Sequence, residues 1–135
     1  MSAVALSAPT VDPDDRGMHD VTQIAADWID AWNSHDLDRI LAHYAAGVTV
    51  RSPRAREVVP ESGGVVHGRA GVESYWRTAL GAAPELRFRL EQAFTTVDGL
   101  AILYRNERDR RVIEMMTFDR DGHIDNVTVA YEPDR

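Results

Sequence analysis

The sequence contains no cysteine, and this excludes disulfide bonds, cysteine nucleophiles and thiolate metal sites. It also lacks an apolar run long enough to span a membrane, and its first residues do not have the basic segment and apolar core of a signal peptide. Basic residues are outnumbered, because 15 Lys and Arg stand against 22 Asp and Glu and give a formal net charge of −7. General binding to nucleic acid or to an anionic membrane requires a basic surface. We therefore expect a soluble cytoplasmic protein that binds neither.

The sequence patterns that hold cofactors are also missing. The glycines at 63–64 and 68–71 do not follow the strand-to-helix pattern of a phosphate or dinucleotide loop. No pair of histidines stands with a carboxylate at a metal-binding spacing, such as a helical i, i+4 pair. We therefore expect no metal and no organic cofactor. Four arginines at 105–111 form a local excess of positive charge, but they alternate with polar and acidic residues and predict a solvated hairpin tip.

A chain of 135 residues is long enough to form one domain with a substantial core, without help from metals or disulfides. Residues 1–18 mix Ser, Ala, Pro and Asp without any period, which predicts a disordered leader. Residues 19–135 are predicted to form the single folded domain.

The stretch 20–53 predicts two helices and a strand joined by tight turns. Its first part places apolar residues at steps of three and four, as one face of an amphipathic helix does. Asp20 is the expected N-cap, Gln23 completes a capping box, and the polar residues 33–35 should end the helix. The apolar positions are Val21, Ile24, Ala25, Trp28, Ile29 and Trp32.

A second helix is predicted over 37–44, because Asp36 can cap it and apolar residues recur on one side. Gly47 lies in the expected C-cap region of this helix. Residues 48–51 follow as a strand, and Ser52-Pro53 should end it because proline cannot donate to a strand ladder.

The next segment, 54–66, contains Pro60 and the pair Gly63-Gly64 and predicts a long loop. Such a loop is either a lid or rim over a pocket or a mobile connector. A third helix is predicted over 72–80 from its apolar spacing, and Gly81 should end it.

The second half of the chain predicts antiparallel strands joined by hairpins. Asp98-Gly99 and Asp121-Gly122 are the expected turns. Helices first and hairpins afterwards predict an α+β protein, with the helices on one face of a curved sheet. The predicted strands cover 86–96, 100–104, 112–118 and 124–131.

Several joints of the chain, taken in order, resemble one superfamily. They are WIDAWNSHDLD at 28–38, YAAGVTV at 44–50, HGRAGV at 67–72 and GHI at 122–124. This order resembles the nuclear transport factor 2-like superfamily and, within it, the polyketide-cyclase (SnoaL)-like and steroid-isomerase-like branch. The resemblance covers roughly residues 20–133. It is specific for a fold and not for a reaction, because this fold hosts enzymes of several classes and non-catalytic interaction domains.

The resemblance implies a cystatin-like cone, in which three N-terminal helices pack in the concave face of a strongly curved, mainly antiparallel sheet around a mostly apolar pocket. Members are commonly homodimers that pack through the outer face of the sheet. Ile113 and Met115, on the second face of strand 112–118, fit such an interface. Alternatively, these two residues cover the sheet edge or contact the leader.

The resemblance also assigns three positions used by steroid isomerases. The hydrogen-bonding tyrosine corresponds to Trp28, the carboxylate base to Ser52 and the protonated acid to Glu114. Serine is not a general base without help, and tryptophan offers one N–H in place of a phenol. Standard ketosteroid isomerase chemistry is therefore not expected.

Glu114 is the first candidate catalytic residue, because it stands between Val112 and Met116 on an apolar face where desolvation would raise its pKa. The alternative is a structural glutamate satisfied by an arginine or a tryptophan N–H.

Asp125 is the second candidate. A two-residue turn would place it opposite Met116 on the same face, whereas a position close to the turn would expose it to solvent.

His67 is a third candidate, as an acid/base or a carbonyl-orienting group beside the segment 54–66, with a structural turn as the alternative. Candidate pocket residues are Trp28, Ser52, Tyr104, Met116 and Tyr131.

Two functions remain open at this stage. One is a pocket protein for a small apolar metabolite that catalyses cofactor-free isomerisation, cyclisation or dehydration next to a carbonyl. The other is a non-catalytic ligand-binding or dimerisation module of the same fold.

Overall fold

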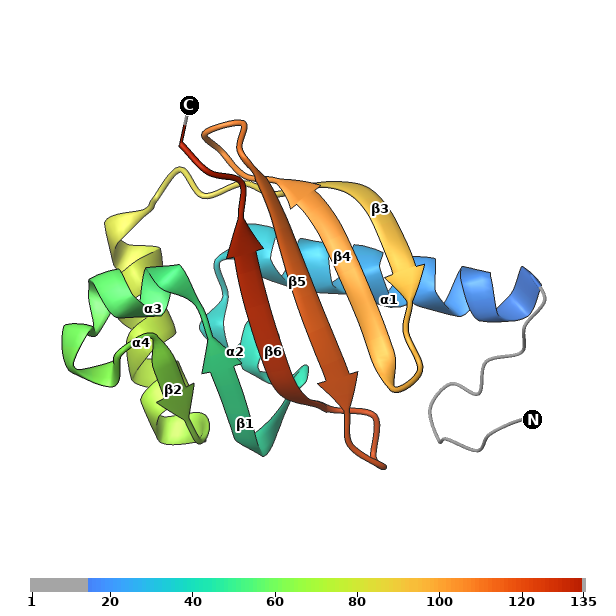
Figure 1. Ribbon diagram of the computed structural model, residues 1–135, viewed down its shortest axis with the longest axis horizontal. Helices are drawn as coiled ribbons and strands as arrows, with labels where there is room; N and C mark the ends of the chain where they lie inside the picture. The colour runs from blue at the N-terminus through green and yellow to red at the C-terminus, as the bar shows by residue number, and fades with distance from the viewer. Residues whose placement is uncertain (1–14, 135) are drawn as a thin grey trace.

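The computed structural model describes residues 15–134, with side-chain positions from Val21 onward; residues 1–14 of the predicted leader lie outside this range. Four α-helices, one 3₁₀ helix and six strands occupy the described residues (Figure 1). The helices are α1 (Asp15–Ser34), α2 (Leu37–Leu41), α3 (Pro53–Val58) and α4 (Arg69–Ala82), and the 3₁₀ helix is η1 (Pro60–Ser62). The strands are β1 (Tyr44–Arg51), β2 (Val65–His67), β3 (Arg89–Thr95), β4 (Gly99–Arg105), β5 (Arg111–Phe118) and β6 (Ile124–Tyr131).

The strands form one open sheet in the order β2-β1-β6-β5-β4-β3. All neighbouring strands are antiparallel except β1 and β6, which are parallel. Figure 1 shows α1 crossing behind this sheet, so the helix and the inner sheet face enclose the core. The predicted α+β class, the mainly antiparallel sheet and the helical cover on its concave face are confirmed.

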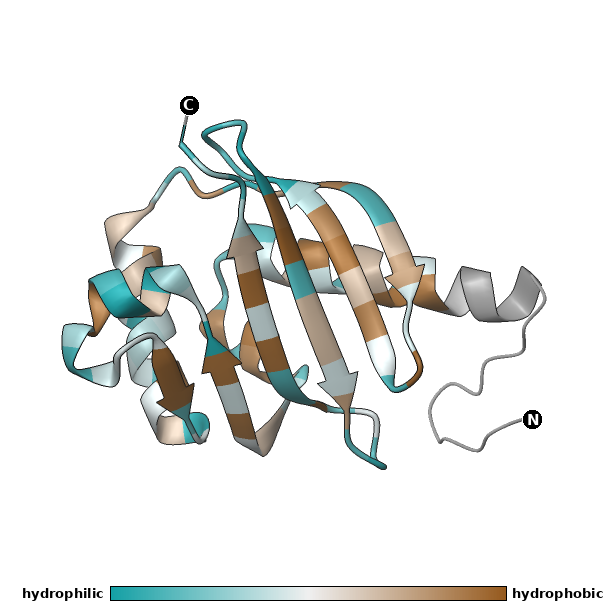
Figure 2. Cartoon of the chain, viewed as in Figure 1, coloured by the Kyte–Doolittle hydropathy of each residue, from teal (hydrophilic) through white to brown (hydrophobic). Residues whose placement is uncertain are grey.

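The core forms where the apolar stripe of α1 meets the inner sheet face. Trp28 is 1% exposed, and its ring centroid lies 6.0 Å from that of Phe88 and 5.6 Å from that of Tyr104. Apolar and polar residues alternate along several strands, as expected when one face is buried (Figure 2). Full burial of a large apolar side chain contributes about 2 to 3 kcal/mol, so this aromatic cluster anchors α1 to the sheet.

The start of α1 differs from the prediction, because the helix begins at Asp15 and Asp20 lies inside it. Residues 15–18, which we assigned to the leader, form its first turn. Gln23 donates from Nε2 to Asp27 Oδ1 at 2.9 Å instead of completing a capping box. The apolar period marks only the turns that pack on the sheet, whereas a nucleated helix continues wherever each added residue gains a hydrogen bond.

The turn after α1 follows the prediction. His35 takes a positive φ of 60°, and the Asp36 carboxylate accepts from the backbone N–H groups of Asp38 and Arg39 to cap α2. However, α2 ends at Leu41 and β1 begins at Tyr44, so Gly47 belongs to a strand and not to a C-cap. The pairing of β1 with β6 shifts register between Tyr44 and Thr49, and glycine tolerates such an irregularity.

The predicted loop 54–66 is wrong, because this segment contains α3, η1 and β2. Ser52 takes an extended conformation and its hydroxyl accepts from the Arg54 N–H, while Pro53 occupies the first helical position. Ser followed by Pro therefore ends β1 and also starts α3, since this pair favours a helix N-terminus. β2 then returns antiparallel to β1.

The strand predicted from residue 86 begins only at Arg89. The preceding segment is held by side chains at the end of α1. Asn33 accepts from the Phe88 N–H at 2.7 Å and donates to the Phe88 carbonyl at 2.9 Å, and His35 Nε2 lies 2.9 Å from the Leu86 carbonyl. A side-chain amide thus replaces the neighbouring strand as the hydrogen-bonding partner of Phe88.

The two predicted hairpin turns are present, but the register of β5 with β6 differs from the prediction. Met116 pairs with Val127, and a shift between Thr117 and Phe118 leaves Asp125 without a direct partner in the ladder. A bulge cannot be deduced from the turn sequence, because it depends on which apolar residues pack inward on the finished sheet.

No helix within residues 15–134 is long and apolar enough to cross a membrane.

Candidate functional site

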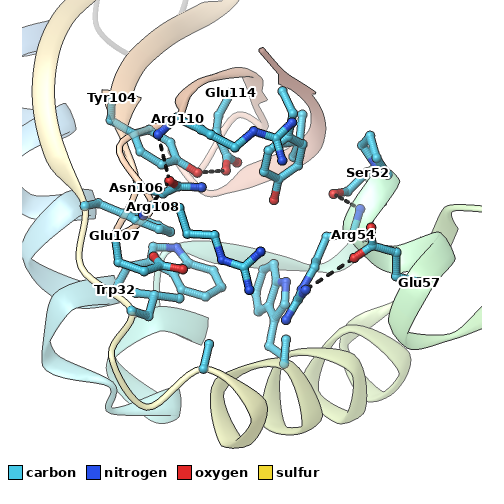
Figure 3. A pocket seen from close by; sticks show the side chains of 18 of the residues that line it. Trp32, Ser52, Arg54, Glu57, Tyr104, Asn106, Glu107, Arg108, Arg110 and Glu114 are labelled. Carbon is cyan, nitrogen blue, oxygen red and sulfur yellow. Dashed lines mark hydrogen bonds and ion pairs between the residues drawn. The ribbon is translucent and has the colours of Figure 1, made fainter. Parts of the chain in front are cut away.

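A cavity of about 290 Å³ opens between the helices and one end of the inner sheet face (Figure 3). This volume lies just below the range for small-molecule pockets, which is roughly 300 to 1,000 Å³. α1, α3 and α4 form its walls together with β4, β5, β6 and the tip between β4 and β5. Its aromatic lining consists of Trp32, Tyr75, Trp76, Phe88, Tyr104 and Tyr131.

Glu114 lies in this cavity on the inner face of β5 and is 9% exposed. Its Oε2 accepts a hydrogen bond from the Tyr104 hydroxyl at 2.7 Å. No arginine or tryptophan N–H among the described residues pairs with it, so the partner is a tyrosine and not one of the two that the structural alternative named. The single phenol partner leaves hydrogen-bonding capacity on the carboxyl group for a ligand.

Burial raises the pKa of the Glu114 carboxyl from 4.5 to about 7, and the hydrogen bond from Tyr104 partly opposes this increase. Desolvation penalises the ionised form, whereas a donor to the carboxylate stabilises it. Near neutral pH the group is therefore present both as acid and as base. A general acid or base works best when its pKa lies close to the working pH.

The phenols around Glu114 remain protonated at neutral pH. Burial and the Glu114 charge raise the pKa of Tyr131 to about 12, with smaller opposing effects from Arg54 and Ser52. Burial also raises the pKa of Tyr75 and of Tyr104 above the ordinary value of 10. These hydroxyls are consequently hydrogen-bond donors along one wall of the pocket.

Four of the predicted site residues, Ser52, Tyr104, Glu114 and Tyr131, therefore line one cavity. Ser52 is 6% exposed and its hydroxyl already accepts from the Arg54 N–H at 3.1 Å as the cap of α3.

Trp28 and Met116 lie in the core behind the cavity and not on its lining. The Trp28 Nε1 donates to the Tyr44 hydroxyl at 2.8 Å, so its one N–H is not directed at a ligand. Met116 is 2% exposed.

His67 and Asp125 are held elsewhere. His67 Nδ1 lies 2.7 Å from Thr49 Oγ1, on the exposed side of β2. Asp125 accepts from the Thr117 hydroxyl at 2.6 Å, on the face opposite Glu114, and the predicted placement opposite Met116 is wrong. Neither residue lines the cavity, so Glu114 has no second carboxylate or imidazole from these positions.

The sequence interpretation missed the arginines of the cavity mouth. The arginines at 105–111 do lie at a hairpin tip, as predicted, but Arg108 and Arg110 also line the cavity, and Arg54 lines it from α3. The signal was visible as a local excess of positive charge. The sequence did not show that these arginines face a cavity, because the helices that complete the mouth are distant in sequence.

No group of three or more His, Cys, Asp or Glu side chains within the described part of the chain is arranged to hold a metal ion. Besides Glu114, the cavity lining carries hydroxyl and guanidinium donors and the carboxylates of Glu57, Glu85, Glu107 and Asp134.

Comparison with solved structures supports the fold described above. A SnoaL-like protein of unknown function from Burkholderia thailandensis is 37% identical, with a TM-score of 0.79, over 84% of this chain and 94% of that one. A protein with a cystatin-like fold from Methylobium petroleophilum is 19% identical, with a TM-score of 0.68, over 94% of this chain and 82% of that one. The epoxide hydrolase/cyclase-like enzyme SalBIII, which acts in pyran ring formation in the polyether salinomycin, is 20% identical, with a TM-score of 0.63, over 84% of this chain and 92% of that one.

A search of the curated proteins found no significant match. The model of the SnoaL-like domain family matches residues 25–127, which include the second half of α1, most of the sheet and Glu114. With the 37% identity to a SnoaL-like protein over most of both chains, this match shows that the chain belongs to the SnoaL-like domain family.

Proposed function

We propose that this protein acts in the cytoplasm, where it binds a small apolar carbonyl compound and catalyses proton transfer next to the carbonyl without a cofactor. The observation that supports the proposal most strongly is the Glu114 carboxyl, which lies in an aromatic cavity with Tyr104 as its hydrogen-bond partner and has a pKa of about 7. A group with these properties takes a proton in one step and returns it in the next.

In the proposed reaction the Glu114 carboxylate removes a proton from the carbon next to the substrate carbonyl, and the electrons of the C–H bond move into an enolate. The Tyr131 hydroxyl donates a hydrogen bond to the enolate oxygen, since it remains protonated at neutral pH. The Glu114 carboxylic acid then returns the proton to another carbon of the same conjugated system. The result is an isomerisation with no net gain or loss of electrons.

Membership of the SnoaL-like family is consistent with this proposal, and the SalBIII relative is an epoxide hydrolase/cyclase-like enzyme. A pocket with one buried carboxyl and several phenols also suits cyclisation or dehydration, in which the acid protonates a leaving or attacked oxygen. The three reactions share the role of Glu114 as acid and base.

The test begins with a thermal-shift screen of small carbonyl metabolites, followed by NMR in D₂O on each hit. Loss of the signal of the proton next to the carbonyl reports its abstraction, even when the product is unknown. We expect the wild-type protein to catalyse this exchange and Glu114→Gln to slow it by about a hundredfold or more, while the thermal shift by the ligand persists. Glu61→Gln is the matched control, because it makes the same replacement at an exposed carboxylate outside the cavity lining.

Exchange that survives in Glu114→Gln would remove Glu114 from the mechanism. Binding without exchange for every hit would favour the second candidate, a non-catalytic ligand-binding module. Ser52 and Trp28 stand at two of the positions that the resemblance to steroid isomerases assigns, and both side chains are already hydrogen-bonded within the protein. This observation keeps the second candidate open.

We also propose that the protein is a homodimer through the outer face of the sheet. Phe94, Met115 and Ile113 are 49%, 51% and 42% exposed, and Phe94 and Met115 are both paired with Ala101 of β4. Exposed apolar residues in adjacent strand positions form a surface that association would cover.

Light scattering after size exclusion tests this assembly. We expect a dimer mass for the wild type and a monomer mass for Met115→Asp, because a charge at the centre of an apolar interface is costly to desolvate. Val97→Asp is the control, since Val97 is 92% exposed in the β3–β4 turn. A monomeric wild type would rule out this assembly.

A further inference from the structure

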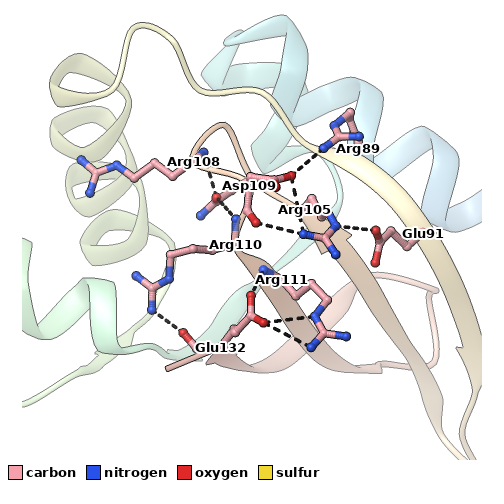
Figure 4. A network of polar contacts seen from close by, with 9 residues as sticks. Arg89, Glu91, Arg105, Arg108, Asp109, Arg110, Arg111 and Glu132 are labelled. Atoms are coloured by element: carbon pink, nitrogen blue, oxygen red, sulfur yellow. Dashed lines mark hydrogen bonds and ion pairs between the residues drawn. The ribbon is translucent and has the colours of Figure 1, made fainter. Parts of the chain in front are cut away.

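The tip between β4 and β5 carries a dense network of charges in which most arginines are paired (Figure 4). Arg105 Nε lies 2.7 Å from Glu91 Oε2, and Arg89 lies 3.0 Å from Asp109. Arg111 pairs with Glu132 at 3.2 Å. These pairs join β3, the tip and the end of the chain, and they leave the corresponding guanidinium groups committed to protein partners.

Arg110 is also held within the protein. Its guanidinium donates to the Glu132 carbonyl and lies 3.4 Å from the Asp134 carboxylate. The same group lies over the Tyr131 ring, 5.6 Å from its centroid. Arg110 therefore builds the wall beside Tyr131, where a backbone carbonyl and an aromatic ring hold its guanidinium in addition to the exposed Asp134 carboxylate.

Arg108 differs from its neighbours. Among the described residues its guanidinium has no carboxylate within ion-pair distance and no hydrogen-bond acceptor. Figure 4 shows its side chain directed away from the paired arginines, and Figure 3 shows it reaching into the cavity. A cation on a pocket wall without a protein partner is suited to an anionic ligand.

The backbone of the tip fixes the position from which Arg108 extends. The Asn106 Oδ1 accepts from the N–H groups of Arg108 at 3.0 Å and Arg110 at 3.1 Å. Asp109 adopts a positive φ of 62°, which Asp tolerates better than most residues, and it completes the reversal. The backbone position of Arg108 is thus set by local hydrogen bonds and not by an ion pair.

A second guanidinium lies across the mouth. Arg54 extends from α3 into the same cavity (Figure 3), and among the described residues its one carboxylate partner is Glu57, at 3.3 Å, a residue whose side chain is 68% exposed. A pair of this kind is worth less than about 1 kcal/mol, so a ligand anion competes with Glu57 for Arg54. Glu85, Glu107 and Asp134 also border the mouth, but none of them lies within ion-pair distance of Arg108 or Arg54.

We propose that the ligand of this pocket is an apolar ring compound that carries a carboxylate or a similar anionic group, with the anion bound by Arg108 and Arg54 at the mouth. The ring then lies against Trp32, Trp76 and Phe88, and the end opposite the anion faces Glu114. This inference rests on the proposed function for the existence of a ligand pocket and adds the chemical class of the ligand. The net negative charge of the chain would not have suggested an anionic ligand.

Isothermal titration calorimetry with cinnamate and its neutral isostere cinnamamide tests the inference on the full chain. At about pH 6 cinnamate is ionised and Glu114 is mainly neutral, so the two probes have the same shape and differ in the charge presented to the arginines and in the N–H donors of the amide. We expect cinnamate to bind about tenfold more tightly than cinnamamide, the ratio typical of one partly exposed charged hydrogen bond.

Arg108→Gln should lower the cinnamate affinity about tenfold and leave that for cinnamamide unchanged, while Arg108→Lys should retain part of the preference. Arg120→Gln is the matched control, because it removes the same charge from the exposed turn at the other end of β5. Glu57→Gln should raise the cinnamate affinity, since it releases Arg54. Arg108 is exposed, so its replacement is not expected to prevent folding.

Equal affinities for the two probes, or an equal loss of cinnamate binding in the Arg120 variant, would overturn the inference and leave the proton-transfer proposal standing. Failure of both probes to bind the wild type would overturn the inference, whereas the pocket proposal is tested separately by the thermal-shift screen. Calorimetry measures binding and not turnover, so the outcome of this experiment does not depend on whether Glu114→Gln loses exchange activity.

Discussion

Replacing Glu114 by glutamine should change how the stability of this protein depends on pH. The carboxyl group is buried and has a pKa of about 7, compared with 4.5 for the unperturbed group. Glutamine has nearly the same shape, and its side-chain carbonyl can still accept the hydrogen bond from the Tyr104 hydroxyl. The substitution therefore removes the ionisation and retains most of the packing.

Whether stability rises or falls with pH depends on which state, folded or unfolded, binds the Glu114 proton more tightly. Below pH 4.5 the carboxyl is protonated in both the folded and the unfolded chain, so ionisation has no effect on stability. Between 4.5 and about 7 the folded chain holds a proton that the unfolded chain has lost, so the free energy of unfolding falls as pH rises. Above about 7 the full penalty is reached, and it amounts to about 3 kcal/mol at about 1.36 kcal/mol per pKa unit.

Urea unfolding followed by tryptophan fluorescence, at about pH 5 and about pH 8.5, measures this effect. The free energy of unfolding of the wild type should fall by about 2 to 3 kcal/mol more than that of Glu114→Gln between the two conditions. Taking the difference between the two proteins cancels the contributions of all other titrating groups. Parallel pH profiles would show that the Glu114 pKa is not raised, and they would refute both the burial argument and the proposed acid/base role.

Two further changes have defined outcomes. Tyr104→Phe removes the donor that stabilises the Glu114 carboxylate, so an NMR titration of the carboxyl carbon should give a pKa above about 7, and a decrease would contradict the assigned hydrogen bond. Gly99→Ala should lower the free energy of unfolding, measured in urea, by about 2 kcal/mol or more, because the added Cβ would lie 1.8 Å from the Met116 carbonyl oxygen. Gly47→Ala is the control: no atom lies within 4 Å of its added Cβ, so the free energy of unfolding should change by less than about 1 kcal/mol.

The sequence by itself determined the elements whose signals are local. The apolar period of α1, the Asp36 cap and the turns at Asp98-Gly99 and Asp121-Gly122 depend on residues close in sequence, and they were predicted with the correct type and order. The inward position of Glu114 followed in the same way from strand alternation, because the residues on either side of a strand are fixed by a period of two.

The tertiary structure alone decided where these elements meet. Asn33 holds Phe88 across 55 residues, and the bulge before Asp125 turns that carboxylate away from Glu114. The sequence predicted that Arg108 lies at a solvated hairpin tip. Only the packing of α3 and α4 against the sheet makes that tip one wall of a cavity. Side-chain periodicity indicates which face of a helix or strand is buried. Contacts between distant segments determine what packs on that face, and therefore where the site forms.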